Sequence, residues 1–316
     1  DEILKPAVID NAEKELLFVD KNNISTYFIN EADYPKRLRE CSDAPVMLYF
    51  KGEADFNKEK VISIVGTRQS TTYGNSFCNN FLKDVSSIFP DTLIISGLAY
   101  GIDIQAHRFA IKYNLPTIGV LAHGLDTIYP SPHRQTAIEM LNNGGLLSEF
   151  QSKTEPDRFN FVRRNRIVAG MADAIVVVES DEKGGSLITA EIANSYCKDV
   201  FAVPGKMTDK YSRGCNKLIA SHKADLLLSS EYFFHQMGWE KESSQKKKSP
   251  KQQNLFITFT NEEQAIIDIL NKKDSIHIDQ LSRELNIPAY TLFSTLLELE
   301  MKGAIKNLPG TLFALS

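Results

Sequence analysis

The sequence has no long apolar runs, no paired cysteines and no excess of basic residues. No apolar stretch among its 316 residues approaches the roughly 20 residues that a membrane-spanning helix needs, so we expect no membrane association. The four cysteines form no CxxC pair and the six histidines form no HxxxH pair, which argues against a metal site and against disulfides. Free thiols in a reducing cytoplasm are the simplest interpretation.

The charge balance excludes a protein that binds nucleic acid through its overall field. Net charge is -4, from 36 basic and 40 acidic residues, whereas non-specific nucleic-acid binders are usually basic. Such binding would therefore need a local basic patch. The chain starts at Asp1 without an initiator Met and without a basic or apolar leader, so we expect no signal peptide and expect residues to be missing upstream.

Short apolar runs alternate with amphipathic stretches over residues 61–229. The runs are rich in Val and Ile and are continuous rather than alternating, which is typical of parallel strands buried on both faces. This alternation predicts a doubly wound, mostly parallel α/β domain. The predicted strands are 61–65, 92–95, 117–121, 146–148, 174–178, 200–203 and 226–228, and the predicted helices are 77–88, 104–113, 134–142, 188–197 and 217–222.

The segments before and after residues 61–229 have different sequence patterns. Residues 12–60 predict a helix end and two strands, at 26–29 and 46–50, as an extension packed on the α/β domain. Residues 240–254 hold five Lys, two Glu and no apolar side chain, which predicts a flexible linker. We therefore predict four parts: a possible remnant of an N-terminal helical domain (1–24), the α/β domain (25–239), the linker (240–254) and a small C-terminal domain (255–316).

The C-terminal pattern of three short helices and a β-hairpin predicts a winged helix. A recognition helix usually carries several Arg or Lys. The third predicted helix, 289–302, carries Glu298, Glu300 and only one base, Lys302. A protein-contact module is therefore at least as good an interpretation as a nucleic-acid module.

Two glycine motifs follow the first two strong strands. Gly66-Thr67-Arg68 combines close backbone approach with two side chains that can donate to a phosphate, and Gly97 ends the second strand. No acidic residue stands where a dinucleotide ribose would be held, so phosphate binding of another kind is favoured. Asp103 is interpreted as a helix N-cap, and its pairing with His107 as structural rather than catalytic.

The segment 158–166 is the most informative, because it holds four Arg, two Phe and no acid. Arg can clamp phosphates and Phe offers a stacking face, which are the requirements for single-stranded nucleic acid. Alternatively, both Phe belong to the core, some Arg form salt bridges and Arg166 begins a helix. The residues concerned are Arg158, Phe159, Phe161, Arg163, Arg164 and Arg166.

A third set of residues reaches the same edge of the predicted sheet. The loop Gly184-Gly185-Ser186 precedes a predicted helix and can present backbone N–H groups to an anion, with Lys183 adding charge. Lys206 stands in a further loop on this edge. Several strands thus deliver Gly, Ser or Thr and basic side chains to the place where this fold binds ligands.

In these motifs the chain resembles the DNA-processing protein A family (DprA, also called Smf). Their order and spacing cover about residues 25–230, and nine motifs in order are far more specific than one. The motifs are VGTR (65–68), SGLAxGID (96–103), AH (106–107), GLDxxYP (124–130), SE (148–149), FxxRNRI (161–167), GGSLITA (184–190), PG (204–205) and RGCNKLI (213–219).

The resemblance implies an extended Rossmann fold followed by the winged helix. It implies a cytoplasmic, non-enzymatic homodimer without cofactor, which binds and protects incoming single-stranded DNA and loads the recombinase RecA during natural transformation. By motif, Gly66, Thr67, Arg68, Gly97 and the 184–186 loop would form a phosphate pocket, Phe161 would stack a base, and Arg158, Arg163, Arg164 and Arg166 would add cations. The chain departs from the family at Tyr100, where Arg is usual, and at Val162, where Pro is frequent.

Two other functions stay open from the residues alone. A Rossmann-like nucleotide N-glycosidase acting on nucleoside monophosphates also uses a Gly-Gly loop and a catalytic Glu, and Glu191 stands at about that position. A protein-interaction adaptor would explain the acidic winged helix but not the phosphate-binding motifs.

Overall fold

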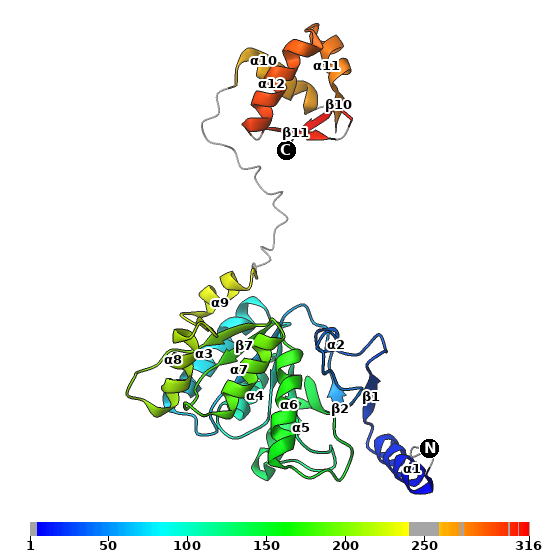
Figure 1. Cartoon of the computed structure of the whole chain (residues 1–316), viewed down its shortest axis with the longest axis vertical. Coiled ribbons are helices and arrows are strands. Elements are labelled where there is room, and N and C mark those ends of the chain that lie inside the picture. Colours follow the sequence, from blue (N-terminus) through cyan, green and yellow to red (C-terminus); the bar gives the residue numbers. More distant parts are fainter. Residues whose placement is uncertain are drawn as a thin grey trace. The chain divides into compact units, whose positions relative to one another are not determined.

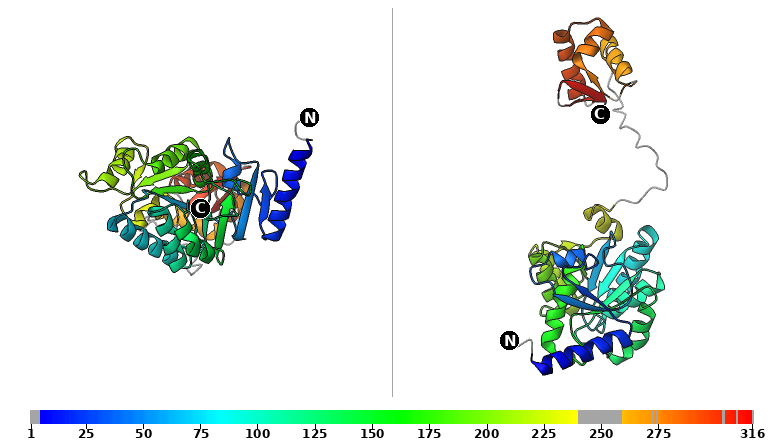
Figure 2. Two further views of the ribbon diagram at one scale, coloured as in Figure 1. Left: turned by 90° about the horizontal axis from the view of Figure 1, so that it is seen from below. Right: turned by 90° about the vertical axis from the view of Figure 1, so that its right-hand side faces the viewer.

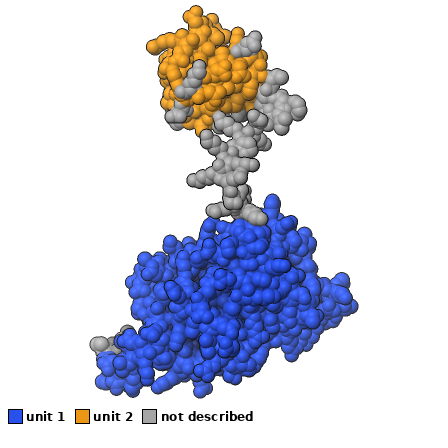
Figure 3. Space-filling view, turned by 180° about the vertical axis from the view of Figure 1, so that it is seen from behind, with its two compact units in different colours: residues 1–242 blue, residues 243–316 orange. Residues whose placement is uncertain are grey.

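The apolar runs form one mixed sheet in the first part of the chain (Figure 1). The computed structural model describes residues 5–239 and 259–315, apart from 272, 274, 303 and 309. Two compact units result, Asp1–Glu242 and Ser243–Ser316 (Figure 3). The predicted linker at 240–254 lies outside the described residues.

The sheet has the order β1-β2-β6-β5-β4-β3-β7-β8-β9. The strands from β6 to β9 pair in parallel, and β1 and β2 add antiparallel strands at one edge. The order reverses between β3 and β7, which is the position where ligands bind in doubly wound sheets. The strands are β1 (Ser25–Phe28), β2 (Met47–Glu53), β3 (Val61–Val65), β4 (Leu93–Ser96), β5 (Thr117–Val120), β6 (Gly144–Ser148), β7 (Ala174–Val177), β8 (Asp199–Ala202) and β9 (Asp225–Leu226).

Helices cover both faces of this sheet, with α6 and α7 side by side on one face (Figure 1). The core on that face also includes α2 and α8, and the core on the other face includes α3, α4 and α9. The helices are α1 (Pro6–Lys21), α2 (Lys36–Arg39), α3 (Thr72–Ile88), α4 (Ile102–Lys112), η1 (Ser131–His133), α5 (Arg134–Met140), α6 (Arg158–Gly170), α7 (Gly185–Ser195), η2 (Lys210–Ser212), α8 (Arg213–Ala220) and α9 (Ser230–Gln236).

Strand β3 shows why its run lacks polar alternation. Val61 and Val65 point to the core under α6 and α7, and Ile62 and Ile64 point to the core under α3 and α4. All four are at most 5% exposed. A strand between two helical layers has no solvent face, so it has no polar alternation. The predicted doubly wound fold is confirmed.

The two strands predicted at 26–29 and 46–50 are present as β1 and β2, but they belong to the sheet instead of packing on the domain. Strands β1 and β2 hydrogen-bond into the sheet itself, through β6. Helix α1 lies beyond them at the outer edge (Figure 2) and packs through Val19 against Tyr49 of β2. Two antiparallel strands therefore cover the ladder groups that β6 would otherwise expose to solvent.

The second unit has the winged-helix arrangement that the sequence predicts. Its helices surround a core that includes Ile266, Leu281, Leu296 and Phe313, and a short strand before the second helix pairs with the hairpin. Thr260 caps the first helix in a capping box with Glu263. The elements are α10 (Asn261–Leu270), β10 (Ile276–His277), α11 (Ile278–Leu285), α12 (Ala289–Met301), β11 (Ile305–Leu308) and β12 (Leu312–Leu315). Among the described residues of both units, no helix is long and apolar enough to cross a membrane.

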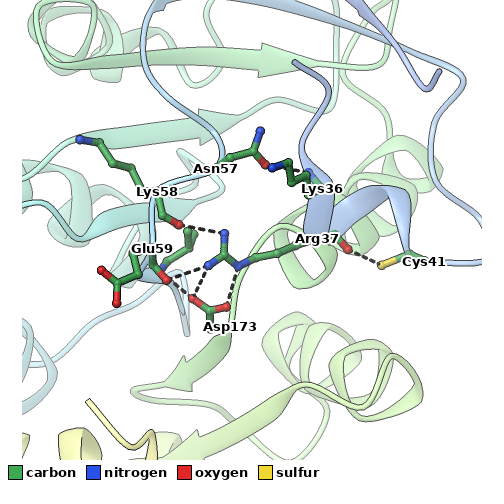
Figure 4. A network of polar contacts seen from close by, with 8 residues as sticks. Lys36, Arg37, Cys41, Asn57, Lys58, Glu59 and Asp173 are labelled. Atoms are coloured by element: carbon green, nitrogen blue, oxygen red, sulfur yellow. Dashed lines mark hydrogen bonds and ion pairs between the residues drawn. The ribbon is translucent and has the colours of Figure 1, made fainter. Parts of the chain in front are cut away.

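An ion pair holds α2 against the start of the parallel sheet (Figure 4). Arg37 donates through Nε and Nη2 to the two carboxylate oxygens of Asp173, at 2.6 and 3.0 Å. It also donates to the carbonyls of Lys58 and Glu59, and Asp173 accepts the backbone N–H of Val61 at 2.9 Å. One guanidinium thus joins α2, the segment before β3 and the residue before β7.

Removing this guanidinium will destabilise the first unit. Arg37→Ala leaves Asp173 with only the Val61 N–H, and we expect a loss of about 2 kcal/mol in the free energy of unfolding. Urea denaturation followed by fluorescence measures it, because Trp239 is the only tryptophan and packs on Phe89. Lys36→Ala, an exposed neighbour, is the control. A loss no larger than that of the control would contradict the prediction.

Candidate nucleic-acid interface

A cleft of about 620 Å³ opens where the sheet order reverses. It lies at the carboxyl ends of β3, β4 and β7, between the amino-terminal halves of α6 and α7. Most of the residues predicted to bind DNA line it. Those residues are Gly66, Thr67, Arg68, Gly97, Arg158, Phe161, Arg164, Lys183, Gly184, Gly185 and Ser186.

The N-terminus of α7 forms one wall of the cleft. Gly184 occupies the N-cap position, and no side chain caps the helix. A Cβ on Gly184 would collide with Ser180 Oγ, whereas Gly185 faces open space. The loop therefore needs glycine for close packing behind it and leaves the first helical turn accessible to an anion. Lys183 is exposed, and no ion pair involves it within the described ranges.

Arg68 also lines the cleft, with its guanidinium over the ring of Phe161. Its Cζ lies 5.2 Å from the ring centroid. It is exposed and makes no ion pair or hydrogen bond to any described residue. The neighbouring Thr67 is used internally, because its N–H donates to the Glu179 carbonyl at 2.6 Å. Arg68 is thus the member of this motif that keeps a free cationic group for a ligand.

The Arg-rich segment forms the start of α6, so the prediction that Arg166 begins the helix is wrong. Asp157 caps the helix by accepting the N–H groups of Phe159 and Asn160, at 2.6 and 3.0 Å. Arg158 follows in the first turn, exposed and without a partner in the part of the chain described. The alternative that Phe159 belongs to the core is also wrong, because its side chain is 84% exposed.

Arg164 is buried and serves the fold. Its Nη1 donates to the carbonyl of Gly97 at 2.6 Å and also to that of Val120. Burial lowers the pKa of Arg164 and raises that of Asp103, and each group opposes the shift of the other. A Cβ on Gly97 would collide with both charged groups. Gly97 therefore makes room for two buried groups of opposite charge in the cleft lining.

The predicted helix cap at Asp103 is wrong. Gly101 occupies the N-cap position, with φ of 76°, and Asp103 lies inside the first turn. There it faces Arg164 in the protein interior, 7% exposed. The sequence showed an acidic residue near a helix start, but its partner comes from a helix 61 positions later.

Arg163 and Arg166 share one carboxylate. Both are ion-paired with Glu149, and the Arg163 guanidinium also lies 5.4 Å from the ring centroid of Phe150. The side chain of Arg166 is only 12% exposed, whereas that of Arg163 is 61% exposed. Burial raises the pKa of Glu149, and the two guanidinium groups oppose this shift. Neither Arg lines the cleft.

Two further candidates lie outside the cleft. Lys206 is exposed in the loop before η2. Glu191, the candidate catalytic residue of the N-glycosidase alternative, is ion-paired with Lys223 at 3.2 Å beside a smaller hollow between α7 and α8. No cluster of His, Cys, Asp or Glu that could hold a metal ion occurs among the described residues.

Sequence reasoning missed an aromatic neighbour of the cleft. Tyr129 lies with its ring centroid 6.1 Å from that of Phe161. It belongs to the GLDxxYP motif, which the sequence analysis used only as a family marker. The composition of that loop gave no indication that its Tyr would meet Phe161, 32 positions away.

Loss of Arg164 will destabilise the first unit more than loss of Arg158, six residues earlier on the same helix. Arg164→Ala removes two buried hydrogen bonds from a charged donor and the positive charge near Asp103, and we expect a loss of about 3–5 kcal/mol. Arg158→Ala removes an exposed, unpaired side chain and should change stability by less than about 0.5 kcal/mol. Urea denaturation followed by Trp239 fluorescence compares them. Equal losses would contradict the assignment of Arg164 to the core.

His107 will make stability depend on pH. It is buried with Nδ1 2.7 Å from Thr117 Oγ1, and burial lowers its pKa to about 3. The unfolded chain binds this proton below about pH 6.5. The stability that His107 contributes is therefore complete above pH 6.5 and declines as pH falls towards 3, by up to about 1.4 kcal/mol per pH unit.

Comparison with His107→Gln isolates this contribution. Unfolding free energies measured from about pH 7 to about pH 4 should fall more steeply for the original chain than for the variant. Parallel pH profiles would show that His107 is not the group responsible.

Comparisons with known proteins agree with this geometry. The family described as DNA recombination-mediator protein A matches residues 25–238, and the DprA winged helix domain matches residues 246–311. The DNA processing protein DprA of Bacillus subtilis is 39% identical over 69% of this chain and 72% of its own length. Protein Smf of Escherichia coli is 31% identical over 94% of this chain and 79% of its own length.

Two solved structures share the fold. DNA processing protein A from Streptococcus pneumoniae superposes with a TM-score of 0.63 at 32% identity, covering 73% of this chain and 82% of that one. DNA processing protein A from Helicobacter pylori, described with a unique single-stranded DNA binding mode, gives 0.61 at 27% identity, covering 68% and 95%. The resemblance first seen in nine short motifs is confirmed over both units, and the chain belongs to the DNA recombination-mediator protein A (DprA) family.

Proposed function

We propose that this protein binds single-stranded DNA in the cleft between α6 and α7. The observation that carries the proposal is the set of unneutralised groups facing the cleft. Arg68 and Arg158 have no ionic partner in residues 5–239 and 259–315, and Lys183 stands beside the uncapped start of α7. Such a site attracts an anion, and a row of cations suits successive phosphates of one strand.

The aromatic ring beside these cations favours binding of single-stranded DNA over binding of duplex DNA. Phe161 lies under Arg68 in the cleft, and the bases of an unpaired strand have free faces for stacking on aromatic rings and guanidinium planes. Bases in a duplex are already stacked on each other. Binding through phosphates and ring faces reads little sequence, so we expect weak base preference.

We further propose that the protein is a recombination mediator rather than an enzyme. In this role a cytoplasmic homodimer protects incoming single-stranded DNA and loads RecA on it during natural transformation. The family description and the solved Helicobacter pylori relative support this role. The position of Glu191 outside the cleft and in an ion pair gives no support to nucleotide hydrolysis. Two copies of the site in a dimer would raise the affinity for one strand through avidity.

Fluorescence anisotropy of labelled oligothymidine, titrated over a salt series, tests the binding. The original chain should bind tightly and lose affinity as salt rises. Arg68→Ala should weaken binding by about tenfold and reduce the salt slope by about 0.7, the contribution of one phosphate contact to a single strand. Duplex DNA of equal length should bind worse.

Arg213→Ala provides a matched control. Arg213 is exposed at the start of α8 and lines neither cavity. Its loss should leave affinity within about twofold. No binding by the original chain at low salt would overturn the proposal. Base release from a nucleoside monophosphate that disappears in Glu191→Ala would favour the N-glycosidase alternative.

A further inference from the structure

We infer that Tyr100 and Tyr129 form a second stacking surface beside the cleft, which receives bases of the same strand after they leave the Arg68 site. The inference rests on the proposed binding of single-stranded DNA and extends it to residues outside the cleft. Neither tyrosine lines the cleft, and both lie next to residues that do.

The sheet order places the two tyrosines on one side of the cleft. Neighbouring strands β7, β3, β4 and β5 end at the same edge, so the loops after them lie in that order. Lys183 follows β7, Arg68 follows β3, Tyr100 follows β4 and Tyr129 follows β5. A strand that crosses this edge from the α7 N-terminus therefore meets the cations first and the tyrosines next.

Direct contacts join the tyrosines to the cleft. The ring of Tyr129 lies 6.1 Å from that of Phe161, which lines the cleft under Arg68. Tyr100 immediately follows Ala99, another lining residue. The guanidinium of Arg68 covers part of Phe161, so Tyr129 is the more accessible ring of this pair.

Both rings are exposed yet held in place. Tyr100 is 46% exposed and Tyr129 49% exposed, and neither hydroxyl has a hydrogen-bond partner among the described residues. Tyr100 packs edge-on against His133 with ring centroids 4.8 Å apart. His133 is itself buried, with Nδ1 2.8 Å from the Leu98 carbonyl. Preorganised rings of this kind lose little conformational entropy when a base stacks on them.

Charge beyond the tyrosines indicates nucleic acid rather than a protein partner. Arg134, the residue after His133, is exposed and has no ion pair within the described ranges. Arg134 is therefore an exposed cation next in the chain to the residue that contacts Tyr100, in addition to Arg68 over Phe161. Alternating cationic and aromatic groups match the phosphates and bases of one strand.

The test compares oligothymidine of about 12 nucleotides with an abasic strand of the same length, which keeps the phosphates and lacks the bases. Tyr129→Ala and Tyr100→Ala should each weaken binding to oligothymidine by about tenfold, the usual effect of losing one stacked base. The salt slope should not change, because no phosphate contact is lost. Binding to the abasic strand should equal that of the original chain.

Two controls separate stacking from other effects. Tyr129→Phe keeps the ring and should bind like the original chain. Tyr290→Ala makes the same change at a side chain that is 83% exposed on α12 of the second unit, and should have no effect. An equal loss on both strands would mean that the variant disturbs the fold or the phosphate site, and would overturn the stacking role.

The outcomes also separate this inference from the proposed function. If the tyrosine variants bind oligothymidine like the original chain while Arg68→Ala binds worse, the second stacking surface is overturned and the cleft proposal stands. If the original chain binds no oligothymidine at low salt, the proposed function itself fails.

Discussion

The buried pair of Arg164 and Asp103 is the constraint on which the candidate site depends. One guanidinium joins α6 to the ends of β4 and β5, through the carbonyls of Gly97 and Val120, and its counter-charge comes from α4. This places the start of α6 over the carboxyl edge of the sheet. Two buried charges are costly unless groups of opposite sign lie near them, and the absence of a Cβ on Gly97 lets the Arg164 and Asp103 side chains both reach this position.

A single Arg-rich segment therefore performs different tasks on different faces of one helix. Arg164 points into the protein, while Arg163 and Arg166 share Glu149 on another side. Among the residues that the structure describes, Arg158 is the one Arg of this segment without an ionic partner. The positive charge at the site thus comes from a few cations without ionic partners among the described residues. A chain of net charge -4 can therefore present a local cleft that attracts anions.

The order of the strands then decides which loops act together. Because β3 lies between β4 and β7, motifs separated by more than 100 positions meet at one edge: Arg68 faces the start of α7, and Phe161 from α6 lies beneath it. The proposed stacking surface at Tyr100 and Tyr129 continues the same edge. The winged-helix unit contributes none of these groups, and its third helix, with Glu298 and Glu300, has little cationic character.

The fold class and half of the residues that line the cleft could be predicted from the sequence alone. Short continuous runs rich in Val and Ile, bounded by turn residues, favour strands buried on both faces, and glycine at a strand end favours close approach of the backbone whatever the partner is. Which of the charged side chains stay without a partner could be seen only in the folded protein. Arg158 and Arg164 are the same residue type in one short segment. Helical periodicity buries Arg164 near Asp103 and leaves Arg158 exposed. The same holds for Tyr129, because its ring contact with Phe161 depends on a neighbour that is distant in sequence.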